Sequence, residues 1–160
     1  MPTEQEWKKA HADLMAKLNL PCKLKLSSWT KVGMHNWDDN YRECYITINP
    51  KADFRVPGHL IMHEAAHHRV MSPIMEKYPS FELFETARNI ECSHMWSKGH
   101  CEHWAQELCK IYGEIGIALP HTTGFAEFAK AAGIIHKVFS KDEDHQMVAV
   151  ADNAGLLEGA

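Results

Sequence analysis

The stretch His63-Glu64-Ala65-Ala66-His67, which reads HEAAH, decides how the rest of this 160-residue chain is interpreted. Residues four apart lie on one face of an α-helix, so His63 and His67 can direct two imidazoles at one metal ion. Glu64 projects about 100° away around the helix axis, where it can reach a water on that metal without being a ligand. The pattern favours zinc, because a catalytic zinc site has three protein ligands and one open position.

The residues around HEAAH predict a helix. Met62, Ala66 and Val70 follow one another at intervals of four and form a stripe that would face the core. Ser72-Pro73 is expected to end the helix, because proline is disfavoured inside one. The two motif histidines then lie on the face beside the apolar stripe, toward the interior.

The sequence upstream predicts a helix and a small sheet. Residues 3–18 are amphipathic and begin with the pattern of a capping box. Residues 22–28 and 43–49 alternate in polarity as half-buried strands do, and a short strand is expected within 29–41. One face of strand 22–28 holds Cys22, Leu24, Leu26 and Ser28. One face of strand 43–49 holds Cys44, Ile46 and Ile48.

Downstream, helices are expected over residues 81–96, 100–116 and 122–139. The sequence thus predicts one α+β domain over 1–139. A small, mainly antiparallel sheet in its first third would pack on several helices, including the HEAAH helix. Residues 140–160 are predicted to be an acidic, flexible tail.

Composition and charge argue against several functional classes. The net charge is −4, and residues 140–160 carry all of it with one lysine and five acids, so the remainder has no basic surplus for nucleic acid. The five cysteines are odd in number and include no CxxC pair, which argues against a disulfide framework or zinc ribbon. Without a signal-peptide pattern or a run of about 20 apolar residues, a cytoplasmic protein that does not enter a membrane is expected.

A third zinc ligand must come from outside the motif. Val70 and Pro73 stand where the longer metzincin motif has a glycine and its last histidine, so that class is excluded. The candidates downstream are Glu85, Glu91, His94, His100 and His103.

Helical phase favours His100 among these candidates. It falls within about 50° of the stripe formed by Trp104, Leu108, Ile111 and Ile115, whereas His103 lies about 110° away on a face that looks solvated. His94 follows the apolar stripe of its own helix and suits a core position or support of a ligand. Glu91 suits an exposed carboxylate.

With these motifs in place, the chain resembles the SprT-like (Spartan-type) zinc metallopeptidases over roughly residues 43–108. The likeness comprises the strand end Ile46-Thr47-Ile48-Asn49-Pro50, the HEAAH helix, and Gly99-His100 with Trp104 four residues on. In that family the two motif histidines and the later histidine bind zinc, and the motif glutamate is the catalytic base. Those roles map onto His63, His67, His100 and Glu64.

The resemblance implies a zincin-like fold and an endopeptidase that acts on protein or peptide. Strand 43–49 is then expected to pair with extended substrate, and a second oxyanion donor is expected among His68, His103, Tyr45 and Tyr78. The gap from His67 to His100 looks longer than is usual in the family, and the DNA-binding additions of some relatives are absent here. Nucleic acid is therefore a partner by resemblance only. The alternatives are a non-catalytic, metal-stabilised binding or regulatory module and a zinc hydrolase of non-peptide amides.

Overall fold

The described part of this chain contains three helices and three strands. The computed structural model describes residues 2–30, 32–38, 42–51, 57–78, 80, 82 and 102–116. The elements are α1 (Glu4–Leu18), β1 (Lys23–Leu26), β2 (Gly33–Trp37), β3 (Cys44–Ile48), α2 (Pro57–Lys77) and α4 (Glu102–Ile115). This is an α+β architecture, as predicted. The predicted helix at 122–139, the tail at 140–160 and, apart from residue 82, the predicted helix at 81–96 lie outside the described residues.

Helix α1 begins and ends as its sequence predicts. The Thr3 side chain accepts a hydrogen bond from the backbone N–H of Glu6, and the Glu6 carboxylate accepts one from the backbone N–H of Thr3, which completes the capping box. Asn19 ends the helix in the left-handed conformation, with φ of 53°. Its buried residues, with Trp7 fully enclosed, pack against α2 and α4.

The sheet is mixed, so the prediction of a mainly antiparallel sheet is wrong. The strand order is β1-β3-β2; β2 pairs with β3 antiparallel, whereas β1 pairs with β3 parallel. The last strand in sequence is therefore inserted between the first two. Alternating polarity indicates which face of a strand is buried, but it carries no information about which strand lies beside it.

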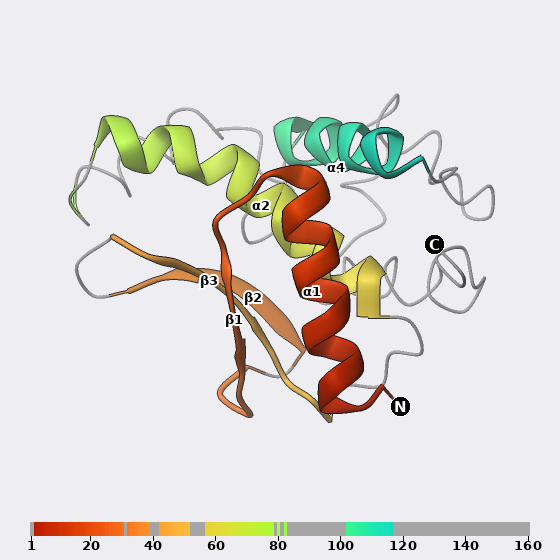
Figure 1. Cartoon of the computed structure of the whole chain (residues 1–160). Helices are drawn as coiled ribbons and strands as arrows, with labels where there is room; N and C mark the ends of the chain where they lie inside the picture. The colour runs from red at the N-terminus through yellow and green to blue at the C-terminus, as the bar shows by residue number, and fades with distance from the viewer. Residues whose placement is uncertain are drawn as a thin grey trace, which may run out of the picture.

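Helix α2 is the central element, lying between the sheet and α4 (Figure 1). Fourteen of its 21 residues are buried, which is typical of a helix covered on several sides. The helix continues past Pro73 to Lys77, so the predicted end at Ser72-Pro73 is wrong. Ile74 and Met75 are buried in the turn after the proline, and their packing offsets the backbone hydrogen bond that proline cannot donate.

Helix α4 covers the far side of α2 with the apolar stripe that the sequence predicts. Trp104, Leu108 and Ile111 are buried, and Tyr112 joins them. At the rim, Arg69 of α2 forms an ion pair with Glu114 of α4. None of the described helices combines the length and apolar character needed to cross a bilayer.

Candidate metal centres

The HEAAH residues lie within α2, as predicted, and are largely withdrawn from solvent. His63 is 1% exposed and Glu64 2% exposed, while His67 is partly buried. The ring centroids of the two histidines lie 5.2 Å apart, with the ring planes at 72°. Helical spacing therefore places the two imidazoles side by side.

Trp104 of α4 lies against both motif histidines. Its ring centroid is 4.8 Å from that of His63 and 5.5 Å from that of His67, on which it stacks. Its indole N–H donates a hydrogen bond of 3.2 Å to the backbone carbonyl oxygen of His63. The tryptophan thereby limits the movement of both imidazoles.

Of the five candidates for the third ligand, the described residues include His103 alone. His103 is exposed on α4, in agreement with the solvated face predicted for it. His100, His94, Glu91 and Glu85 lie outside the described residues. The assignment of His100 therefore stays a prediction.

Glu64 faces the sheet on a different side of α2 from the motif histidines. A Cβ atom placed on Gly33 would lie 3.4 Å from Glu64 Oε1, so the carboxylate stands directly over β2. Of the three described strands, β2 is at one edge and β3 is in the centre, paired on both sides. The prediction that strand 43–49 pairs with substrate is therefore wrong, because its main-chain groups already bond to β1 and β2.

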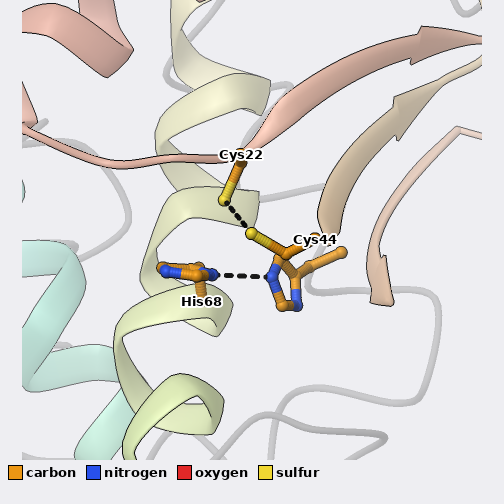
Figure 2. A group of neighbouring side chains, drawn as sticks. Cys22, Cys44 and His68 are labelled. Atoms are coloured by element: carbon orange, nitrogen blue, oxygen red, sulfur yellow. Dashed lines mark hydrogen bonds between the residues drawn. The ribbon is translucent and has the colours of Figure 1, made fainter. Parts of the chain in front are cut away.

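A second group of side chains that could hold a metal ion lies between the sheet and α2. The parallel register pairs Lys23 with Tyr45, which places Cys22 beside Cys44 at the strand ends. Cys44 also pairs with Trp37 of β2. His35 lies two residues before Trp37, so its side chain is on the same face of the sheet as those of Trp37 and Cys44. From α2, one helical turn after Glu64, His68 points toward the two cysteines (Figure 2). We call Cys22, His35, Cys44 and His68 the Cys/His cluster.

The ligand atoms of the Cys/His cluster all lie within 4.8 Å of one another, close enough to hold one metal ion. The Sγ atoms of Cys22 and Cys44 are 3.5 Å apart, and His35 Nε2 is 2.9 Å from His68 Nδ1. The hydrogen bond that Cys44 shares with Cys22 lowers the pKa of the Cys44 thiol well below its usual range, and the hydrogen bonds with the two histidines lower it further. The hydrogen bond to Cys44 and burial raise the pKa of the Cys22 thiol, and burial lowers the pKa of His35.

Sequence reasoning missed this cluster, although one signal was present. Cys22 and Cys44 are the first residues of two predicted strand faces, so parallel pairing brings them together. His68 is one of the four candidates for the second oxyanion donor, and the structure buries it within the cluster. Of the other predicted oxyanion donors, Tyr45 donates its hydroxyl to Glu43 at 2.9 Å, and Tyr78 is partly buried at the end of α2.

Comparison with known proteins adds no further information about either site. No protein-family model, characterised protein or solved structure matches the chain. The resemblance to SprT-like metallopeptidases therefore rests on the sequence motifs within residues 43–108.

Proposed function

We propose that this protein is a zinc-dependent endopeptidase whose metal is held by His63, His67 and His100. The observation that carries the proposal is the pairing of the two motif imidazoles, 5.2 Å apart on α2, with both rings against Trp104. Neutral imidazoles suit zinc, and rings restrained by packing need little reorganisation to bind it. The position of Trp104 also favours His100 as the third ligand, because α4, which carries the tryptophan, begins two residues after that histidine.

Glu64 is the proposed general base. A zinc ion held by His63, His67 and His100 would supply a water of lowered pKa and would polarise the carbonyl of the substrate. Glu64 takes the proton from the attacking water and delivers it to the leaving amine. Glu64 lies next to His63 in the sequence of α2, but its side chain is on a different side of the helix from the two histidines. This position suits a base that is not itself a ligand of the metal.

The substrate is proposed to pair with β2. This strand is an edge of the described sheet, and Gly33 brings its backbone close to the Glu64 carboxylate. A peptide added to that edge gains main-chain hydrogen bonds irrespective of its side chains. Broad sequence specificity is the expected consequence.

The proposal is tested by measuring metal content and casein or peptide cleavage on the same preparations. Glu64→Gln is expected to keep the metal of the wild type and to lose activity by about 10²–10⁴-fold, the usual contribution of a general base. Glu76→Gln is the matched control, because Glu76 is an exposed glutamate of the same helix. A Glu64→Gln variant with full activity would overturn the proposal.

His100→Ala tests the third ligand separately. The variant is expected to contain one equivalent of zinc less than the wild type and to be inactive. Unchanged metal content in this variant would transfer the role to His94, His103 or Glu91.

The Cys/His cluster favours one alternative, a metal-stabilised module without catalysis. It is the one group of three or more potential ligands found within the described ranges. Under this alternative the protein binds metal but cleaves neither casein nor peptides, and His63→Ala leaves the metal content unchanged.

A further inference from the structure

We propose that Cys22, His35, Cys44 and His68 form a second, structural zinc site, separate from the proposed catalytic one. It would join the ends of β1 and β3 and the middle of β2 to the helix that carries HEAAH. The site does not depend on the proposed peptidase activity. Its one ligand on α2, His68, lies on the side of the helix that packs against the sheet, whereas His63 and His67 face Trp104.

The spacing of the donor atoms fits tetrahedral zinc. With usual zinc–ligand distances, two sulfurs lie about 3.8 Å apart and two nitrogens about 3.3 Å apart on a regular tetrahedron. In the cluster the sulfurs are 3.5 Å apart and the nitrogens 2.9 Å apart. These two pairs need to separate by only a few tenths of an ångström to admit the ion, and all four donor atoms already lie within 4.8 Å of one another.

Charge and burial also suit zinc. Two thiolates and two neutral imidazoles neutralise one divalent cation, so the complete site carries no net charge. That matters because Cys22, Cys44 and His68 are buried, and an unbalanced charge at such a place is costly. Zinc binds cysteine as the thiolate, so the ion displaces any proton that the two sulfurs still carry.

Four protein ligands distinguish this site from a catalytic one. Structural zinc sites are closed by four nitrogen or sulfur ligands, whereas catalytic sites keep one position for water or substrate. The cluster supplies all four, from the residue before β1, from β2, from β3 and from α2. Its ligand His68 is one turn from Glu64, and its ligand His35 is two residues from Gly33. The metal would thus fix α2 against β2 where Glu64 meets the strand.

A disulfide between Cys22 and Cys44 is the competing explanation for the paired cysteines. It would require the sulfurs to approach from 3.5 Å to about 2.05 Å. It would also leave unexplained why the nitrogen atoms of His35 and His68 lie beside the two sulfurs. Both cysteines are free thiols in the structure.

Cobalt substitution in the full chain tests the proposal. The protein is purified under reducing conditions, stripped of metal and titrated with Co²⁺ alone. Wild type is expected to develop the near-ultraviolet absorption of thiolate bound to cobalt. The same absorption is expected in a Cys92→Ser/Cys101→Ser/Cys109→Ser variant, which retains only the cysteines of the cluster. Its absence from that variant would overturn the proposal.

Variants of the ligands complete the test. Cys22→Ser/Cys44→Ser is expected to lose the absorption and one equivalent of zinc, whereas His63→Ala keeps the absorption whatever its peptidase activity. His59→Gln is the control for damage to a buried histidine of α2, because His59 bonds to Tyr112 at 2.7 Å and belongs to neither set; it should keep the absorption. Absorption that persists in Cys22→Ser/Cys44→Ser, or a Cys22–Cys44 disulfide in freshly prepared wild type by mass spectrometry, would refute the site.

Discussion

Gly33 lets β2 approach Glu64 because it carries no side chain. It is buried and lacks a positive φ, so the need for glycine here is one of space rather than of backbone conformation. An added Cβ would lie 3.1 Å from Ile48 Cδ1 and 3.4 Å from both Leu60 Cδ1 and Glu64 Oε1. The sequence around Gly33 predicts a strand and a turn, but it cannot show that this glycine faces the motif glutamate, because that contact joins residues 31 positions apart.

Gly33→Ala is expected to affect activity more than stability. The two aliphatic atoms are ends of flexible side chains that can shift by tenths of an ångström, so the free energy of unfolding should change by no more than about 1 kcal/mol. If Glu64 is the general base, its displacement should lower kcat/KM by roughly tenfold, since small misplacements of catalytic groups are costly. Steady-state kinetics and urea unfolding of the same variant separate the two effects.

Gly113→Ala is the matched control for that substitution. Gly113 lies inside α4, and a Cβ added there meets no atom within 4 Å. Replacing glycine by alanine inside a helix should raise the free energy of unfolding by about 0.5–1 kcal/mol, without any effect on kcat/KM. Equal activity of the two alanine variants would contradict a close positioning of Glu64 by Gly33.

At the scale of elements, α2 shows what local sequence can and cannot predict. The helical period around HEAAH correctly places Met62 and Ala66 in the core, and the capping box correctly places the start of α1. The helix end predicted at Pro73 is wrong because the helix-breaking effect of proline is local, whereas the burial of Ile74 and Met75 depends on tertiary packing. Proline inside a helix costs about 3 kcal/mol, and the burial of two apolar side chains can outweigh that cost.

Pro73→Ala is expected to stabilise the protein by about 1–2 kcal/mol. Alanine restores the backbone donor that proline lacks inside a helix, and the greater freedom of the unfolded chain offsets part of that gain. Pro73 is exposed, so no buried contact is lost. Urea unfolding measures the change, with Glu76→Ala as an exposed control on the same helix. A decrease in stability would contradict a continuous helix through this position.

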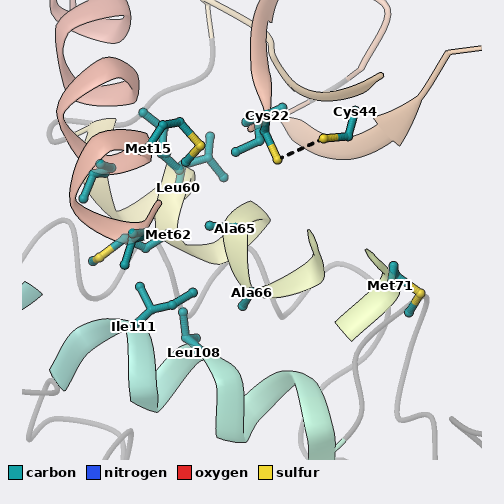
Figure 3. Packing of buried hydrophobic residues seen from close by; sticks show 14 of the residues in the cluster. Met15, Cys22, Cys44, Leu60, Met62, Ala65, Ala66, Met71, Leu108 and Ile111 are labelled. Carbon is teal, nitrogen blue, oxygen red and sulfur yellow. Dashed lines mark hydrogen bonds between the residues drawn. The ribbon is translucent and has the colours of Figure 1, made fainter. Parts of the chain in front are cut away.

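Ala66→Leu tests the close packing of α2 on α4. Ala66 is fully buried, and Figure 3 shows it on the side of α2 that faces α4, where Leu108 and Ile111 point toward α2. The larger side chain should force the helices apart and lower the free energy of unfolding by about 1–3 kcal/mol. Ala12→Leu on the exposed face of α1 should change it by less than about 0.5 kcal/mol. Comparable stability of the two variants in urea would show that the space beside Ala66 is not filled.

The two candidate metal sites differ in how far the sequence predicts them. His63, Glu64 and His67 lie within one helical turn, so their spacing alone predicts a common site. The Cys/His cluster is assembled from segments up to 46 residues apart, and it exists only because β3 is inserted beside β1. Strand alternation predicts the faces of Cys22 and Cys44, but strand order and the docking of α2 are tertiary facts that no local pattern contains.

Removal of metal should therefore destabilise the whole described fold through the Cys/His cluster. A ligand that binds only the native state adds about 2.7 kcal/mol at 100 times its Kd, which corresponds to a Tm shift of roughly 5–10 °C for a chain of this size. A chelator should lower the Tm of wild type and of Glu64→Gln equally, because Glu64 is not a ligand. Cys22→Ser/Cys44→Ser should begin at a lower Tm and respond less, since only the HEAAH site remains for the chelator to empty. An equal response of wild type and the double serine variant in calorimetry would place the stabilising metal at HEAAH alone.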